Sequence, residues 1–190
     1  YINVTRGLVH NGDSIRKLVL LAERGLPALW IPVTSGGTTG PVTLAGNVAV
    51  NNAGVLVGLV LANLVREGTP VVVPGFGGEF LDLRTMVDPY AEPDSMGVVP
   101  SLAHHYDLPM FSLAGGSDSK AVDQQAATDA SLTMLWHALA GGHLVHDSGY
   151  LESGLCGSLA QLAISVEIAS STGASTAPVA LDEAALALDL

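Results

Sequence analysis

Four apolar runs that each stop at a glycine-containing polar loop constrain the fold of this chain more than any other feature. They occupy residues 28–40, 70–76, 109–120 and 141–154, and the segments between them are long enough for helices rich in Ala, Leu and Val. In the last run, Leu144 and Val145 suit a buried strand, and nearby glycines let the chain turn sharply. The repeat of strand, polar loop and helix indicates an α/β fold with a parallel sheet.

Capping and turn residues set the boundaries of the expected elements. We expect strands at residues 1–4, 28–33, 71–73, 110–113 and 143–146, and helices at 13–23, 41–66, 93–106, 121–140 and 158–169. This makes about five βα units, fewer than the eight of a closed (β/α)₈ barrel. We therefore predict a partial barrel of TIM-barrel type over residues 1–170. The small polar residues 170–178 predict a linker, followed by a short acidic helix at 181–190.

Composition narrows the class of protein. Nearly half of the 190 residues are apolar, which is enough for one domain with its own core. The formal charge of −11 argues against nucleic acid and against an anionic membrane surface as partners. The apolar stretch 53–65 is shorter than a membrane span and predicts a buried helix. A single cysteine and no visible secretory signal favour the cytoplasm, and the ends of the chain suggest an excised domain.

Two glycine-rich loops have both a structural and a functional interpretation. Residues 36–40 lie before a helix, where free backbone N–H groups can hold a phosphate or carboxylate, but the same sequence suits a plain turn. The loop is not a Walker motif, because no Gly-Lys-Ser/Thr follows at the required spacing. Residues 115–120 carry hydroxyls, Asp118 and Lys120, which can orient a substrate, or Asp118 or Ser119 can cap a helix.

The remaining polar residues are weaker indicators of a functional site. Asp82 and Arg84 form a local ion pair or contact a ligand, and His104 and His105 suit the end of a helix better than a metal site. We expect no metal site around His146, because a structural zinc site usually needs more cysteines than this chain has. Without an evident histidine partner, the cysteine at position 156 reads as a core or site-lining residue.

Four motifs, taken in order, resemble the trimethylamine methyltransferase family, whose members are corrinoid-dependent amine methyltransferases. They are Pro-Val-Thr-Leu-Ala-Gly at 41–46, Leu-Asp-Leu-Arg-Thr at 81–85, Gly-Gly-Ser-Asp-Ser-Lys at 115–120 with Gln124, and His-Asp-Ser-Gly-Tyr-Leu-Glu-Ser-Gly at 146–154. The resemblance covers residues 7–169, and the ordered series is more specific than any one motif.

The resemblance implies a (β/α)₈ barrel whose mouth holds a methylated amine and receives a corrinoid protein, so that Co(I) attacks the N-methyl carbon. The protein then aligns two partners and excludes water. A quaternary ammonium has no N–H donor and is recognised by aromatic faces and negative charge. The implied catalytic residues are His146, Asp147, Tyr150 and Glu152. The implied substrate-binding residues are Thr38, Thr39, Phe76, Arg84, Asp118 and Lys120, with Trp30 as a further aromatic candidate, and Arg84, Lys120 or the amides of Thr38 and Thr39 would hold a substrate carboxylate.

Two departures from the family pattern refine this expectation. Trimethylamine enzymes of the family use pyrrolysine, which this sequence lacks, so the resemblance points to the branch acting on quaternary amines such as glycine betaine. Family members are more than twice as long, so this segment alone is expected to be inactive and to pair with another copy through open strand edges. The alternative is a non-catalytic module that binds a methylamine or a corrinoid protein. A metal-dependent hydrolase is a weaker option.

Overall fold

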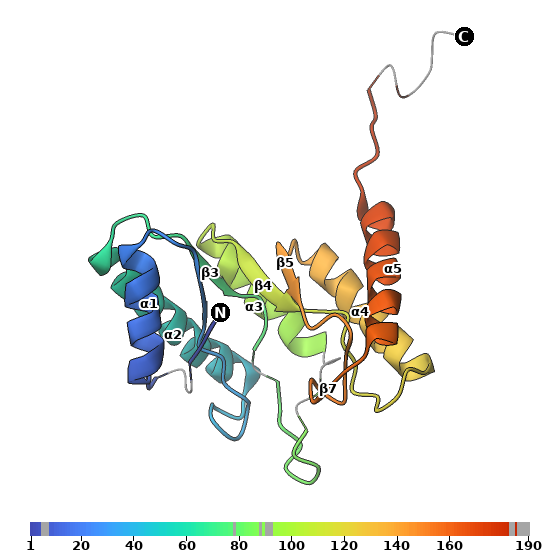
Figure 1. The fold of residues 1–190 in the computed structure, drawn as a ribbon, viewed down its shortest axis with the longest axis horizontal. Helices are drawn as coiled ribbons and strands as arrows, with labels where there is room; N and C mark the ends of the chain where they lie inside the picture. Colours follow the sequence, from blue (N-terminus) through green and yellow to red (C-terminus); the bar gives the residue numbers. More distant parts are fainter. Residues whose placement is uncertain (5–7, 78, 88, 90–92, 183–184, 186–190) are drawn as a thin grey trace.

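The computed structural model describes residues 1–4, 8–77, 79–87, 89, 93–182 and 185, without the side chains of 93–95. Its centre is a five-stranded sheet in which every neighbouring pair is parallel and the strands follow chain order (Figure 1). The strands are β1 (Ile2–Asn3), β2 (Ala28–Ile31), β3 (Val71–Pro74), β4 (Met110–Leu113) and β5 (Leu144–His146). The predicted parallel α/β sheet is confirmed.

Five helices connect and follow these strands. They are α1 (Gly12–Glu23), α2 (Leu44–Val65), α3 (Pro93–His105), α4 (Gln124–Leu139) and α5 (Leu159–Thr176). Each helix contacts the next one along the chain, from α1 at one side of Figure 1 to α5 at the other. A small antiparallel pair, β6 (Tyr150–Leu151) with β7 (Cys156–Gly157), follows β5. The order of strands and of helices is that of successive βα units.

Helix starts differ from the prediction by a few residues because other side chains cap them. Asn11 caps α1 by accepting a hydrogen bond from the Ser14 amide, so the cap is upstream of the predicted Asp13 or Ser14. Thr43 caps α2, which leaves Pro41 outside the helix. Asp123 caps α4 in place of Asp118 or Ser119. In each case the capping oxygen bonds an N–H group three residues later.

The predicted linker at 170–178 is wrong for most of its length, because α5 continues to Thr176. The hydroxyls of Ser175 and Thr176 donate to carbonyls four residues earlier, so their hydrogen bonds are made within the helix. Most of the predicted helix at 181–190 lies outside the described residues. Figure 1 shows the last turns of α5 and the chain after them extending away from the sheet.

The two faces of the sheet are covered differently. On one face, strand residues such as Trp30, Val73 and Met110 share a core cluster with helix residues that include Leu18 and Val55. The cluster on the other face joins Ile31, Val72, Phe76 and Phe111 with three partly buried strand neighbours, and it contains no helix residue. Side chains alternate between the faces of a strand, so the helices cover one face and leave the other open within the described chain.

The open face is curved. Tyr1, next to β1, stacks on His146 of β5 with ring centroids 5.7 Å apart and an interplanar angle of 10°. Five strands laid flat would separate the outer two by roughly 19 Å, because neighbouring strands lie about 4.8 Å apart. The sheet therefore curls until its outer strands approach each other, as in part of a barrel. Within the described residues no hydrogen-bonded pairing joins β1 to β5, so closure of a barrel is not shown.

Helix α2 is longer than the predicted apolar stretch. Its 22 residues are long and apolar enough to cross a membrane by length and composition alone, and about a third of its most apolar window is buried. Core helices of soluble proteins pass the same test. Four described residues on its outer side, Leu56, Val57, Val60 and Leu64, are exposed, so the predicted buried helix is buried on one side only.

A buried histidine on α4 predicts acid sensitivity. His137 is mostly buried, and its Nδ1 has no hydrogen-bond partner within the described chain. Burial lowers the pKa of His137 below its ordinary value, and the nearby charge of His143 lowers it further. The unfolded chain, with a histidine pKa of about 6.5, then binds more protons. The stability from neutral His137 is complete above about pH 6.5 and is lost as pH falls towards the lower folded pKa.

We expect the urea midpoint to fall from pH 7.5 to pH 5.5, and to fall less in the variant His137→Gln. Urea unfolding at both pH values measures this difference, and His105→Gln, which changes an exposed histidine, is the matched control. An equal fall in wild type and His137→Gln would show that another group causes the acid sensitivity.

Candidate functional site

A cavity of about 320 Å³ lies on the open face, near the carboxyl ends of the strands. Each of the five strands contributes to the wall, either directly or through residues that flank it: Tyr1 and Asn3; Val33, Thr34 and Ser35; Phe76 and Glu79; Leu113; His146, Asp147 and Ser153. Parallel sheets place their ligand sites at this end, where several strands stop and their loops converge. We call this cavity the strand-end pocket.

A larger hollow of about 490 Å³ lies between α3 and α4. Its lining is mostly apolar, and His104 is its one titratable residue among the described residues. The Nε2 atom of His104 already bonds to the carbonyl of Ala140 at 2.7 Å. The smaller strand-end pocket gathers several ionisable and aromatic groups, so we take it as the candidate site.

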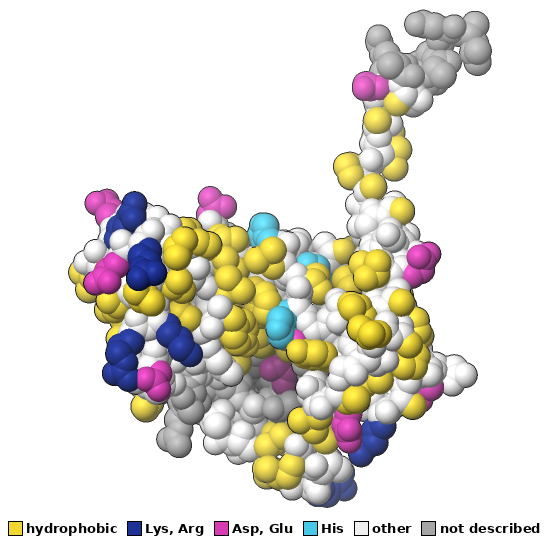
Figure 2. All heavy atoms as spheres, in the orientation of Figure 1, with side chains coloured by type: hydrophobic (Ala, Val, Ile, Leu, Met, Phe, Trp, Pro, Cys, Tyr) yellow, Lys and Arg dark blue, Asp and Glu magenta, His cyan; other side chains and the backbone are white. Residues whose placement is uncertain are grey.

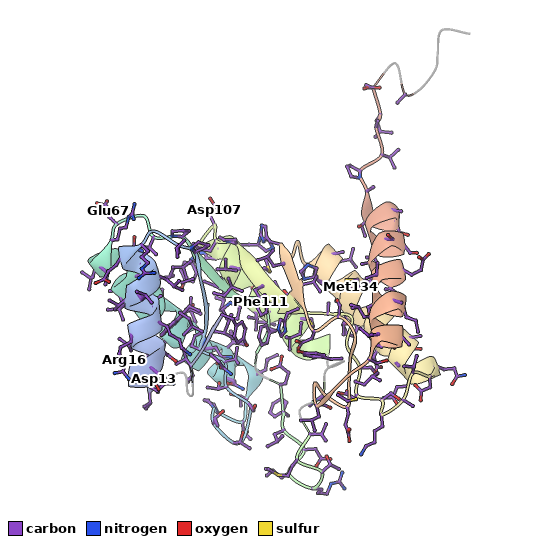
Figure 3. All side chains as sticks on the ribbon, in the orientation of Figure 1. Asp13, Arg16, Glu67, Asp107, Phe111 and Met134 are labelled. Atoms are coloured by element: carbon purple, nitrogen blue, oxygen red, sulfur yellow. The ribbon has the colours of Figure 1, made fainter. Side chains whose placement is uncertain are left out.

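The rings of Tyr1, Phe76 and His146 line one side of the strand-end pocket, and Phe111 packs against all three without lining it. His146 stacks on Tyr1 and lies 5.0 Å from the centroid of Phe111, while Phe111 meets Phe76 edge to face at 6.0 Å. Tyr150 approaches His146 from outside the pocket wall, at 6.1 Å and 89°. Figure 3 places Phe111 in the middle of the molecule, between α1 and the helices at the other side. Such ring faces attract a cation without requiring an N–H donor on it.

Carboxylates supply negative charge to the same pocket. The Asp147 side chain is only 4% exposed, and one of its oxygens contacts Nδ1 of His146. Glu79 adds a second carboxylate, which accepts a hydrogen bond from the Gly77 amide at 3.0 Å. Burial raises the pKa of the Tyr1 phenol, and the negative charge of Asp147 raises it further, so this phenol stays protonated at neutral pH. In Figure 2, histidine and acidic side chains border a broad hydrophobic area at the centre of the visible face.

The loop after β5 has an unusual backbone. Asp147, Glu152 and Ser153 all have left-handed φ angles, of 73°, 52° and 54°, although none is glycine. This conformation costs free energy for most L-residues, although it is easier for aspartate. Here it turns the chain so that Asp147 and Ser153 face the strand-end pocket while Glu152 points away from it.

Hydrogen bonds join this loop to the loop after β4. The amide of Ser117 donates to the carbonyl of Tyr150 at 3.0 Å, and the Glu152 amide donates to the carbonyl of Ser119 at 2.9 Å. The Ser153 hydroxyl donates to Asp118 at 2.8 Å. Asp118 therefore holds Ser153, which lines the pocket, although Asp118 itself does not line it. Two motifs that lie about thirty residues apart in the sequence thus form one rim of the site.

The structure brings only part of the predicted set into the pocket. Phe76, His146 and Asp147 line it, and Asp118 supports it through Ser153. Tyr150 and Glu152 lie outside its wall, and Glu152 pairs with Lys120 at 3.0 Å on the exposed rim. Lys120 is therefore not a described pocket residue either.

Arg84 and Trp30 are corrections to the predicted site. The Arg84 side chain is 92% exposed and pairs with Asp82 at 3.5 Å, as the local ion-pair interpretation proposed. Trp30 is fully buried on the helix-covered face, where its Nε1 donates to the carbonyl of Gly54 at 3.0 Å. An indole packed in the core cannot contact a ligand on the opposite face. Cys156 is exposed on β7, so its predicted core or site-lining position is wrong.

Thr38 and Thr39 are also wrongly predicted, because their amides are occupied. The amides of Thr38, Thr39 and Gly40 all bond to the carbonyl of Ser35, and the Gly36 amide donates to the carbonyl of Glu79. No amide of these four residues remains free to cradle an anion, and Thr38 and Thr39 line a separate surface hollow. The plain-turn interpretation of residues 36–40 is confirmed.

Several pocket residues were missed. Thr34 and Ser35 directly follow the predicted strand 28–33, and that position was the available signal. Tyr1, Asn3 and Glu79 carry no comparable signal, because their place depends on the curl of the sheet and on a pairing between loops.

The family model and three relatives that match this chain are described as methyltransferases of methylated amines. A family model described as trimethylamine methyltransferase (MTTB) matches residues 1–190. Trimethylamine methyltransferase MttB of Desulfitobacterium hafniense (strain DSM 10664 / DCB-2) is 32% identical over 173 residues, which is 89% of this chain and 34% of that protein. MttB of Methanosarcina thermophila is 36% identical over 78% of this chain and 31% of that protein. Glycine betaine methyltransferase of Desulfitobacterium hafniense (strain Y51) is 32% identical over 80% of this chain and 32% of that protein. The chain thus spans about a third of the length of these relatives.

Proposed function

The chain belongs to the trimethylamine methyltransferase family, and we propose from this premise that the protein moves a methyl group from a methylated amine to the cobalt of a corrinoid carried by a partner protein. A quaternary amine such as a betaine is the proposed donor. The observation that supports this proposal most is the strand-end pocket, where aromatic rings and the buried carboxylate of Asp147 meet. This is the combination that binds a methylated ammonium.

The charge of the pocket agrees with a cationic head group. Its described lining includes Asp147 and Glu79 but no lysine or arginine. An ammonium nitrogen substituted by methyl groups cannot donate hydrogen bonds, so ring faces and nearby carboxylates provide its attraction. The candidates once considered for a substrate carboxylate, Arg84, Lys120 and the amides of Thr38 and Thr39, all lie elsewhere. We therefore assign to this part of the protein the binding of the ammonium head.

The residues present fit an external methyl acceptor. The described pocket contains no cysteine, and Cys156 is exposed outside it. The Co(I) corrinoid would supply the attacking electron pair as the C–N bond breaks, and the pair of that bond would stay on nitrogen, leaving a tertiary amine. The chain's own residues would hold the ammonium in one orientation and exclude water from it. Because the positive charge on nitrogen diminishes during transfer, the carboxylates serve binding and orientation more than acceleration.

A methyl-transfer assay tests this function. The full-length protein would be incubated with Co(I) corrinoid under anaerobic conditions and with glycine betaine, carnitine, tetramethylammonium or trimethylamine in turn. We expect methylated corrinoid to appear with a quaternary amine, together with one equivalent of the demethylated amine. Saturable binding of an amine without any transfer would instead support the alternative, a non-catalytic methylamine-binding or scaffold module.

A further inference from the structure

Two asparagines of α2 form a layer of hydrogen bonds behind the strand-end pocket. Asn47 and Asn51 are one helical turn apart, both are buried, and neither lines the pocket. The hydroxyl of Thr34, which does line it, donates to Oδ1 of Asn51 at 2.8 Å and also contacts Oδ1 of Asn47. The Asn47 amide group donates back to the carbonyl of Thr34 at 3.3 Å. The Thr34 hydroxyl has only one proton to donate, so both amide oxygens depend on the same donor. Thr34, Asn47 and Asn51 therefore form one hydrogen-bonded group.

The same amides lie against two loops. A side chain added at Gly36 would meet the Phe80 ring at 2.8 Å and the Asn47 amide at 3.4 Å, and one added at Gly77 would meet the Asn51 amide at 2.8 Å. These glycines let the loops after β2 and β3 lie directly against the asparagines. The loops are then joined by the Gly36 amide, which donates to the carbonyl of Glu79 at 2.7 Å.

We infer that Asn47 and Asn51 are positioning residues, which act through Thr34 and through the contact between these two loops to hold Thr34, Phe76 and Glu79 at the pocket. This inference rests on the proposed function for its ligand. Burying an amide side chain only to fill a core costs free energy, because the amide must replace the hydrogen bonds that it made to water. Their bonds to Thr34 and their contacts with Gly36 and Gly77, next to Ser35 and Phe76, are what a site with fixed geometry needs, since displacements of about 1 Å reduce binding and catalysis strongly.

The first test measures the loops without any ligand. Hydrogen–deuterium exchange would be followed by mass spectrometry in the full-length protein and in Asn47→Ala and Asn51→Ala. We expect exchange to become faster in the peptides that contain Gly36 and Gly77 and to stay unchanged in the peptide that contains Ser112. Asn52→Ala is the matched control, because Asn52 lies on the same helix but donates to Tyr106, which directly follows α3. Unchanged exchange at Gly36 and Gly77, or faster exchange throughout the protein, would overturn the inference.

The second test measures binding of tetramethylammonium by calorimetry, well below the melting temperature of each variant. We expect Asn47→Ala and Asn51→Ala to raise Kd about 10-fold, a cost of about 1.4 kcal/mol. Thr34→Val should do the same, while Thr34→Ser, which keeps the hydroxyl, should restore wild-type affinity. The double variant Thr34→Val with Asn51→Ala should be no weaker than either single one. Fully additive losses would show that Asn51 does not act through Thr34.

The two tests separate the inference from the proposed function. If wild type binds none of the methylated ammonium compounds, the proposed function fails, and the exchange experiment still decides whether the asparagines hold the loops. If wild type binds but neither asparagine variant changes Kd or exchange, the positioning role fails while the proposed function stands.

Discussion

Replacing Gly58 with alanine is expected to lower the free energy of unfolding by about 2 kcal/mol, although alanine is the better helix former. A Cβ atom at position 58 would lie less than 3.0 Å from three atoms of the Trp30 indole. Trp30 is fully buried and is held by its hydrogen bond to Gly54, so the ring has no free space to move into. Because all three contacts are this close, the overpacking cost lies at the upper end of its usual range, about 3 kcal/mol, against a gain of about 1 kcal/mol in helix propensity.

Gly97→Ala is the matched control for this prediction. Gly97 also lies within a helix, α3, but an added Cβ there would meet nothing within 4 Å. This variant should be neutral or more stable by up to about 1 kcal/mol, because only the propensity term remains. Urea unfolding of wild type and both variants measures the difference. Equal stability of Gly58→Ala and Gly97→Ala would mean that α2 shifts away from β2 easily, and the close packing of Gly58 on Trp30 would not matter.

Asp147→Asn is expected to weaken binding of tetramethylammonium by about 100-fold. The Asp147 carboxylate is almost completely buried at the strand-end pocket, where water screens it poorly. Two unit charges about 5 Å apart at an effective dielectric constant near 20 attract each other by roughly 3 kcal/mol. Asparagine keeps the shape of the side chain and tolerates the left-handed backbone at this position, so mainly the charge is removed. Titration calorimetry with the full-length protein measures the loss.

Asp107→Asn provides a matched control for the charge. Asp107 also has a left-handed backbone, with φ of 53°, but lies between α3 and β4 at the amino-terminal end of the sheet. Figure 3 shows Asp107 at the edge of the molecule. It lies far from Asp13, which marks the start of α1 and follows the carboxyl end of β1. We expect Kd to change less than twofold in this variant. A similar loss in both variants would indicate a general effect of net charge, and unchanged affinity in Asp147→Asn would place the ammonium outside the strand-end pocket.

The fold was largely predictable because each βα unit has local signals. The strand Met110–Leu113 agrees with the prediction, and β2, β3 and β5 differ from it by one or two residues at an end. Gly25, just after the first helix, is the kind of residue that ends a helix: its φ is 65°, a conformation in which glycine lacks the steric cost of a side chain. The tail was mispredicted because Ser and Thr near residue 175 bond to their own helix, an option that composition alone does not reveal.

The candidate site was predictable only in part. Within the motif 146–154, His146, Asp147 and Ser153 line the strand-end pocket, whereas Tyr150 and Glu152 lie outside its wall. The roles within such a motif depend on which way each side chain turns, and the left-handed residues Glu152 and Ser153 reverse that direction over a short span. The basic candidates Arg84 and Lys120 were misplaced because exposed loops satisfy their charges with local carboxylates.

The sequence by itself determined the order of strands and helices, the loops that carry polar groups and the resemblance to a methyltransferase family. These properties depend on local periodicity, capping and motif order, which a linear chain contains. The tertiary structure alone decided that Tyr1 stacks on His146, that Asn47 and Asn51 support Thr34, and that Trp30 lies on the helix-covered face. The curl of the sheet and the register between loops create these contacts, and both arise only when residues distant in the chain pack together.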